Sequence, residues 1–119
     1  MALPPPVPKA VFVGEGEAVD YKPAVDVKAG EVKVQGELVG VSRRDIPAGT
    51  LGALAVTGVF DFPKASGTGA AIAAGSKVYW DADDGFAGTD EDGGANKFLG
   101  KAVRAASNDD AEVRVRLSQ

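Results

Sequence analysis

Glycine and proline interrupt this chain so often that no long helix can form. Sixteen glycines and seven prolines are spread along 119 residues. Glycine weakens a helix through its conformational freedom, and proline removes a backbone donor and clashes with the preceding turn. Between these interruptions lie short runs rich in valine, alanine and aromatic residues, which are typical of strands. The sequence therefore predicts an all-β fold, and a chain of this length can bury one core.

Alternation of polar and apolar residues predicts where the clearest strands lie. Residues 24–28 and 31–35 alternate with a period of two on either side of Ala29-Gly30, which predicts a β-hairpin with one wet face. Residues 37–42 are more uniformly apolar and are expected to form a strand buried on both faces. The alternation is strictest over residues 111–117, and its charged face suits the edge of a sheet.

The middle of the chain should supply most of the core. Residues 51–62 form two strands or one bent strand, with Gly52 and Gly58 at bulges or tight corners of a small barrel. Residues 63–75 are the only stretch in which a turn or two of helix is expected. Further strands are expected at residues 10–13, 18–21, 76–81 and 97–106. The expected core residues are Phe60, Phe62, Val78, Trp80, Val113 and Val115.

These elements predict a single small β-barrel or β-sandwich-like domain over residues 10–119, preceded by an arm, residues 1–9. Pro4, Pro5, Pro6 and Pro8 fix the arm in an extended, polyproline-like conformation. The arm is either a mobile tail or a segment that lies on a neighbouring subunit. Beyond the recurring short strand and Ala-Gly turn, no internal repeat at a fixed period is visible.

The ionisable residues narrow the possible functions. A net charge of −4 and a pI of about 4.7 argue against binding to nucleic acid. The chain has no histidine and no cysteine, which removes the commonest general base, the commonest transition-metal ligands and any disulfide. No segment reaches the ~20 apolar residues of a membrane span, and the start lacks a signal-peptide pattern. We therefore expect a soluble, cytoplasmically made protein with no cofactor and no nucleic-acid or membrane partner.

Residues 81–95 form an acidic, glycine-rich excursion that is either a calcium site or a solvated loop. Gly85 arrives one position too early for a calcium-binding loop, which favours the solvated loop. Gly67-Thr68-Gly69 lacks the third glycine of a dinucleotide fingerprint, and Gly100-Lys101 is followed by alanine where a phosphate-binding loop needs Ser or Thr. Ser66 has no histidine to activate it. No metal site, nucleotide site or catalytic residue is therefore predicted.

Two other stretches carry alternative interpretations. Arg43, Arg44 and Asp45 form either a binding loop or a solvated loop in which Asp45 pairs with one of the arginines. Tyr79 and Trp80 either mark a ligand surface or, because aromatic residues are few in this chain, plug the core. The sequence pattern favours the solvated loop and the core plug.

Several stretches together resemble a family of small tailed-phage and prophage proteins. The most specific are residues 58–65, Gly-Val-Phe-Asp-Phe-Pro-Lys-Ala, and residues 78–81, Val-Tyr-Trp-Asp. The likeness extends from about Phe12 onward through Asp20-Tyr21 and residues 36–41, 99–103 and 113–117. Members of this family are described as capsid cement or head decoration proteins, and some carry a recombinase-associated label. The proline-rich start and the acidic excursion do not match the family pattern.

The resemblance implies a structural, non-enzymatic virion protein that binds the outer surface of the expanded phage head and stabilises it. Its partner would be the major capsid protein, and the family implies a homo-oligomer, a trimer first and a dimer second. The residues expected to contact the capsid or sister subunits are Pro4, Pro5, Pro6, Pro8, Arg43, Arg44 and Asp45. The alternative is a ligand- or host-binding module on the virion surface that uses the acidic excursion with Tyr79 and Trp80 to hold carbohydrate.

Overall fold

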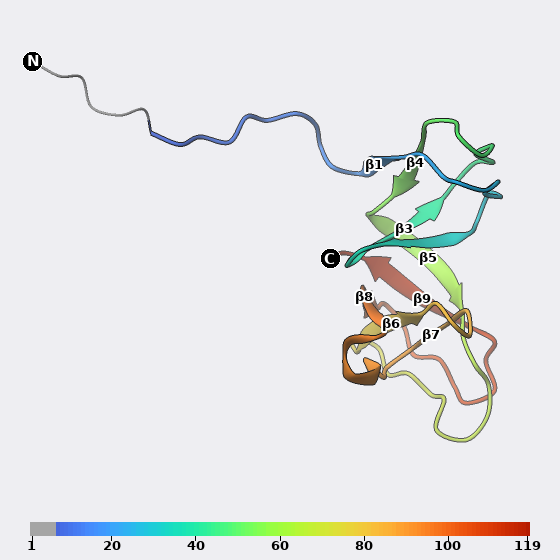
Figure 1. Ribbon diagram of the computed structural model, residues 1–119. Helices are drawn as coiled ribbons and strands as arrows, with labels where there is room; N and C mark the ends of the chain where they lie inside the picture. The colour runs from blue at the N-terminus through green and yellow to red at the C-terminus, as the bar shows by residue number, and fades with distance from the viewer. Residues whose placement is uncertain (1–6) are drawn as a thin grey trace, which may run out of the picture.

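The computed structural model describes residues 7–119, and over these residues nine strands form two antiparallel sheets (Figure 1). The predicted all-β fold is confirmed. The sheets stack in a sandwich-like arrangement and do not close a barrel, so the barrel alternative is wrong. The one helical element in the described range is a 3₁₀ turn, η1 (Asp92–Gly94), and none of the helical structure there is long and apolar enough to cross a membrane.

The first sheet has four strands in the order β1-β4-β3-β2. Its strands are β1 (Ala18–Tyr21), β2 (Val32–Gln35), β3 (Leu38–Ser42) and β4 (Gly52–Ala55). Strands β2 and β3 are joined directly by Gly36 and Glu37. Gly36 has a φ of 62°, a left-handed conformation that glycine adopts without steric cost, so the chain can reverse in two residues.

The second sheet has five strands in the order β5-β9-β8-β6-β7. Its strands are β5 (Gly58–Pro63), β6 (Lys77–Asp81), β7 (Phe86–Gly88), β8 (Lys97–Ala102) and β9 (Glu112–Leu117). Strand β9, the most strictly alternating segment, lies inside this sheet between β5 and β8. The expectation that its charged face protects an edge is therefore wrong, because arginines on one face of a strand do not determine whether that strand has two neighbours.

The two sheets repeat one topology. If β7 is set aside, each sheet takes its first, fourth, third and second strands in that spatial order, all antiparallel. The segments before β2 and β6 are bridged in matching ways, Val27 to Ile46 in one unit and Ile72 to Ala106 in the other. The backbone thus contains an internal duplication, of which the Ala-Gly turn that recurs at Ala29-Gly30 and Ala74-Gly75 is a trace in the sequence. The units differ by the excursion between β6 and β8, which supplies β7.

Glycine occupies the same place in the third strand of both units, Gly40 in β3 and Gly100 in β8. A Cβ atom on Gly40 would lie 2.6 Å from the Cβ of Leu54 in β4. A Cβ atom on Gly100 would overlap the backbone carbonyl oxygen of Arg116 in β9. At Gly100 the obstacle is main chain, which cannot move without disturbing the pairing of β8 with β9. The close approach of these strands therefore requires glycine.

One core cluster spans both sheets. The second sheet supplies most of it, and Val39 and Val41 of β3 extend into it from the first sheet. Five of the six residues expected in the core are buried, namely Phe62, Val78, Trp80, Val113 and Val115, and Phe60 packs half-buried against them. The Phe62 ring lies 6.1 Å from that of Trp80 and 6.2 Å from that of Phe60.

A second contact between the sheets is made by Gln119. Strand β4 ends at Ala55, opposite Val41. The next residue of β3 whose backbone N–H and C=O point away from β2 is Val39, and it has no partner in β4. The Gln119 side chain takes that place: its Nε2 donates to the Val39 carbonyl and its Oε1 accepts from the Val39 amide, each at 2.6 Å. The neighbouring Ser118 amide donates to the carbonyl of Leu99 in β8. The residues that follow β9 therefore bond to both sheets.

Two local expectations about strand pairing are wrong. Residues 24–28 do not pair with 31–35; β2 pairs with β3 instead, and Val27 alone bridges to Ile46. Alternation identifies a strand but not its partner, and the two-residue turn at Gly36 brings β3 closest. Residues 10–13 form no strand, because the chain there runs away from both sheets and meets nothing to pair with (Figure 1).

The expected helical turns over residues 63–75 are also absent. Gly67 has a φ of 122°, outside the helical range, and its amide donates to the carbonyl of Asn108. Further along, Ile72 exchanges two backbone hydrogen bonds with Ala106. These long-range bonds determine the path of the segment and outweigh the helical preference of its alanines.

We predict that Gly100→Ala lowers the free energy of unfolding by about 2–3 kcal/mol, since the added methyl group forces β8 and β9 apart. Urea denaturation of the variant would measure this. Gly88→Ala is the matched control: Gly88 also lies in a strand, has no positive φ, and has no atom within 4 Å of the place that the added methyl group would take. Equal effects of the two substitutions would contradict the account.

We predict that Gln119→Ala lowers the free energy of unfolding by about 1–2 kcal/mol, because it removes two hydrogen bonds at a partly buried position. Amide hydrogen exchange should show the Val39 amide losing protection. Ser118→Ala serves as the control, since only the backbone of Ser118 bonds to Leu99. Unchanged exchange at Val39 in Gln119→Ala would contradict the role given to this side chain.

Candidate functional site

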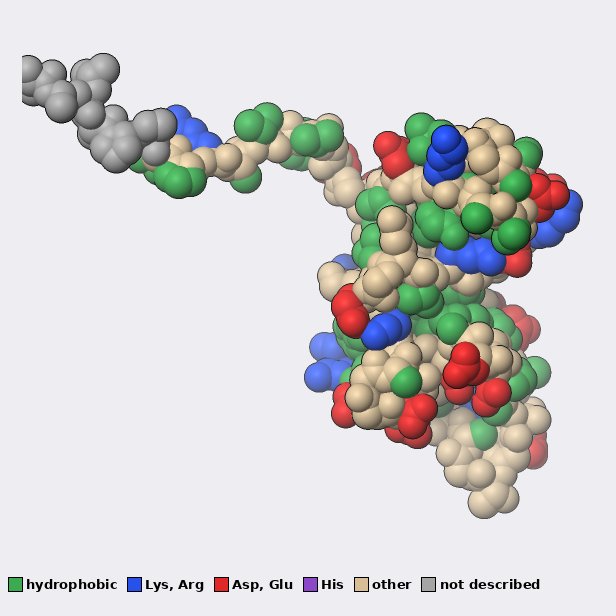
Figure 2. Space-filling view, in the orientation of Figure 1, with side chains coloured by type: hydrophobic (Ala, Val, Ile, Leu, Met, Phe, Trp, Pro, Cys, Tyr) green, Lys and Arg blue, Asp and Glu red, His purple; other side chains and the backbone are tan. Residues whose placement is uncertain are grey.

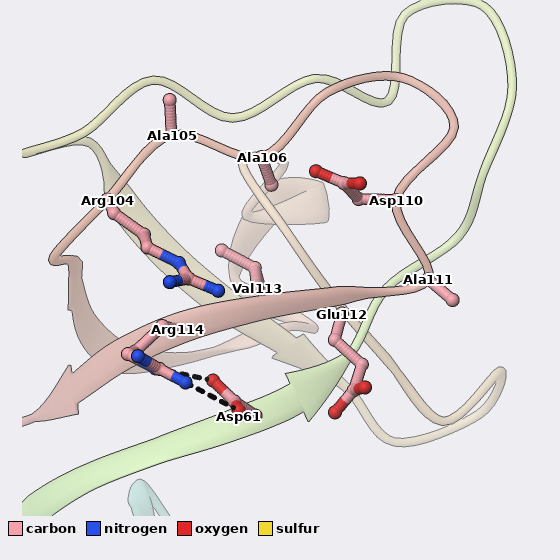
Figure 3. Close-up of a pocket in the computed structure, with 9 residues that line it drawn as sticks. All are labelled: Asp61, Arg104, Ala105, Ala106, Asp110, Ala111, Glu112, Val113 and Arg114. Carbon is pink, nitrogen blue, oxygen red and sulfur yellow. Dashed lines mark hydrogen bonds and ion pairs between the residues drawn. The ribbon is translucent and has the colours of Figure 1, made fainter.

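A charged concave surface lies along β5 and β9 in the second sheet. It is a hollow of about 380 Å³ whose charged lining residues are Asp61, Arg104, Asp110, Glu112 and Arg114; we refer to it as the charged hollow (Figure 3). Asp61 and Arg114 are directly opposite in the register of β5 and β9. Arg104 and Asp110 come from the loop that joins β8 to β9. The hollow therefore follows from strand pairing and one loop.

The centre of the hollow is a two-pronged ion pair. The Arg114 Nε donates to Asp61 Oδ1 at 2.9 Å, and its Nη2 donates to Asp61 Oδ2 at 3.1 Å. Hydrogen bonds from Arg114 hold the pKa of Asp61 below its usual value, and the same bonds raise the pKa of Arg114. Both side chains are about two-fifths exposed, at 40% and 39%, so solvent screens the pair. The pair shapes a surface and activates no nucleophile.

Asp110 serves the loop beside this pair. Its Oδ2 accepts from the backbone amide of Ser107 at 2.7 Å, and that bond holds the pKa of Asp110 below its usual value. The carboxylate thereby closes the turn between β8 and β9. It is committed to its own backbone rather than free to coordinate a ligand.

Lys64 is a buried charge that the sequence pattern did not single out. Only 3% of the residue is exposed. Its Nζ donates to the carbonyl oxygens of Ala65 at 2.8 Å and Asp110 at 2.9 Å, with that of Asn108 at 3.5 Å. The ammonium group thus joins the end of β5 to the turn before β9. Its place in the family-like stretch 58–65 was the available signal, but nothing in the sequence indicates burial.

The acidic excursion is a folded hairpin extension whose carboxylates bond to its own backbone. Asp81 Oδ1 accepts from the amides of Asp83 and Asp84, and Asp90 Oδ1 accepts from the amide of Asp92. These carboxylates shape their own turns. Across residues 7–119 no group of three Asp, Glu, His or Cys residues is placed to hold a metal ion.

Arg43, Arg44 and Asp45 lie exposed in the loop between β3 and β4. The expected pairing of Asp45 with an arginine is wrong: Asp45 Oδ1 accepts instead from the amide of Ala29 at 2.9 Å. That amide is held at a fixed place, whereas a long arginine side chain must be ordered to pair. In the described part of the chain neither Arg43 nor Arg44 forms an ion pair, so both charges face solvent.

The other expected contact residues lie in the arm. Pro4, Pro5 and Pro6 lie outside the described residues, and Pro8 is exposed within the extended stretch that precedes β1. Residues 7–9, the described part of the arm, do not lie beside the Arg43 loop, since the stretch from residue 7 runs away from both sheets (Figure 1).

Tyr79 and Trp80 do not form a shared platform. They are consecutive in β6, so their side chains point to opposite faces of the sheet. Trp80 is buried against Phe62, and Tyr79 packs edge-on against Phe98 with ring centres 5.7 Å apart. A carbohydrate surface that needs both rings is therefore absent from this strand.

Taken together, the described residues define an all-β scaffold of two duplicated sheets, whose polar side chains mostly serve its own turns and strand pairs. A family model for phage cement proteins matches residues 13–117. The chain belongs to the phage cement protein family. No curated protein and no solved structure matches it. Membership implies a structural role in association with a phage capsid.

In the charged hollow we predict that Arg114→Ala moves the pKa of Asp61 back up toward its ordinary value of 3.8. The pair's contribution to stability is present at neutral pH and is lost as pH falls through the lowered pKa of Asp61. The difference in stability between the two proteins should therefore shrink in acid. Carbon-detected NMR titration of the Asp61 carboxyl group would measure the shift, and an unchanged midpoint would contradict the account. Arg116→Ala on the same strand is the control.

Proposed function

We propose that this protein binds the outer surface of the expanded phage head, through the major capsid protein, and stabilises the head. The observation that supports this is the match to the phage cement family over residues 13–117, which takes in every strand of both sheets. An all-β body with a net charge of −4 would stay soluble until many copies dock on a repeated lattice.

We further propose that the protein acts as a homo-oligomer, with a trimer preferred over a dimer. Several copies bound together around a symmetry axis add weak contacts through effective concentration. Arg43 and Arg44 are the best placed capsid contacts on the body, because both are exposed and unpaired within residues 7–119 and Asp45 holds their loop in place. Pro4, Pro5, Pro6 and Pro8 are proposed as further contacts in the arm.

Cosedimentation with decoration-free shells, expanded and unexpanded, tests the proposal. We expect saturable binding to expanded shells, at a fixed ratio to the major capsid protein that reveals which symmetry positions are filled. Bound shells should also withstand heating better than bare ones. Binding to neither form of shell would contradict the proposal and turn attention to a ligand- or host-binding module on the virion surface.

The Arg43 loop can be tested with matched charge reversals. We predict that Arg43→Glu with Arg44→Glu weakens binding to expanded shells by about tenfold and reduces its dependence on salt, because electrostatic contacts at an interface depend on ionic strength. Lys77→Glu with Lys101→Glu makes the same change of net charge on exposed strand positions of the second sheet. Equal weakening by both double variants would show a general charge effect and contradict a specific contact.

A further inference from the structure

The stretch before β1 presents an apolar run that its own chain leaves uncovered. Val11, Phe12 and Val13 are 83%, 78% and 95% exposed, and they are consecutive. The other large exposed apolar residues of the described chain occur singly. Figure 2 shows this stretch projecting from the body with apolar side chains along it. A contiguous exposed apolar segment of this kind indicates a surface that becomes buried on association.

The second observation is an open strand edge on the first sheet. In the second unit, the outer edge of β6 is covered by β7, which pairs antiparallel with it and buries Ala87 to 3% exposure. The excursion between β6 and β8 supplies that strand. In the first unit β2 turns directly into β3, and no strand within residues 7–119 lies beyond β2. The duplication thus shows which edge is covered in one unit and bare in the other.

The bare edge has the backbone groups that a further strand requires. The backbone amide of Ser42 donates to the carbonyl of Glu31, so these two residues form a hydrogen-bonded pair. Residue pairs along two antiparallel strands alternate between hydrogen-bonded and non-hydrogen-bonded. Lys33 therefore bonds to β3, whereas the N–H and C=O groups of Val32 and Val34 point away from it. The bonds of Val39 to Gln119, on the side away from β2, agree with this alternation. Val32 and Val34 are also half-buried at the margin of the shared core.

We propose that residues 10–13 of one copy dock as a fifth strand on the β2 edge of a second copy, in the place that β7 takes on β6. Val11 and Val13 alternate with Phe12 in the same way as Val32 and Val34 alternate with Lys33. In the docked strand the side chains of Val11 and Val13 would therefore pack beside Val32 and Val34 at the margin of the core. The outward N–H and C=O groups of β2 would gain hydrogen-bond partners at the same time. Residues 10–14 carry no charge, so their burial leaves no ion unpaired.

A second copy is the occupant that the geometry favours over the segment's own body. The segment enters the sheet at β1, which is the edge opposite β2 in the order β1-β4-β3-β2. The two edges are three strand spacings apart, about 14 Å. The segment leads away from its own sheets in Figure 1, so its own body does not cover it. Donor and acceptor surfaces differ, so the contact is heterologous and can close a ring of copies.

The inference does not depend on capsid binding, and most of the segment precedes residue 13, where the family match begins. The experiment therefore uses the full chain without shells. Light scattering after size exclusion, over a wide concentration range, should show an oligomer that dissociates on dilution. Residue-resolved amide exchange should show the Val32 and Val34 amides protected at high concentration and exposed at low concentration.

Three variants identify the two sides of the contact. Val13→Lys alters the donor, and Val34→Pro removes an outward amide of the acceptor edge while leaving the bonds of β2 to β3. Each should weaken association by roughly thirtyfold or more, because the first loses one buried apolar side chain and the second disrupts the hydrogen bonding of the docked strand. Val7→Lys is the control, since Val7 is 71% exposed and lies outside the docking run. Circular dichroism checks that each variant is folded.

The outcomes are decisive in either direction. Loss of association in Val13→Lys and Val34→Pro, with Val7→Lys unchanged, supports the strand exchange. A monomer at every concentration overturns it, and so does an oligomer that neither variant weakens. Protection of Val32 and Val34 that is independent of concentration would mean that the segment folds back on its own sheet, which overturns the second copy as occupant. If Val34→Pro fails to fold, the concentration dependence of exchange in the unchanged chain still decides.

Discussion

The two hydrogen bonds between the Gln119 side chain and the backbone of Val39 secure the way the two sheets meet. Strand β4 is too short to pair with the whole of β3, because the chain must leave it after Ala55 to begin β5. A primary amide carries donor and acceptor groups in the geometry of a peptide, so it substitutes for the missing strand residue. Buried backbone groups must find partners, and here the partner comes from the other sheet.

The shared core follows from this arrangement. Val39 and Val41 bury against the second sheet, where Phe62 and Trp80 supply the bulk. The first sheet has smaller buried side chains of its own, chiefly Val27, Ile46 and Leu54. Because few large side chains are buried within the first sheet alone, that sheet depends on packing against the second sheet for stability, even though both sheets have the same strand order. The duplicated units therefore share a strand order and differ in the size of the side chains that they bury.

The sequence was sufficient for the fold class and for the strands whose pattern is strict. Strands β6 and β9 could be predicted because alternation and β-branched or aromatic residues agree there. Partners could not, since pairing depends on turn geometry, as Gly36 shows for β2 and β3. The duplication was hidden because few matching places share a residue type and the excursion between β6 and β8 changes their spacing. Gly40 corresponds to Gly100, but Ser42 corresponds to Ala102. The candidate site was predictable to a smaller degree, because the ion pair of Asp61 with Arg114 depends on the register of two strands far apart in sequence. The burial of Lys64 likewise depends on carbonyl groups from two segments, and no local pattern encodes their convergence.

The spatial order of the strands also constrains how quickly this chain can reach its fold. In both units the first strand pairs with the fourth: Ala18 lies opposite Ala55, and Gly58 opposite Leu117. Each pairing requires the closure of a long loop, and the entropy cost of that closure comes before the first hydrogen bond between the strands forms. Such non-local contacts slow folding. On the ribosome, β5 is made well before β9 and must wait with both edges unpaired. Until β9 follows, the unpaired edges of β5 can pair with another chain, so the strand order that slows folding also exposes the new chain to aggregation.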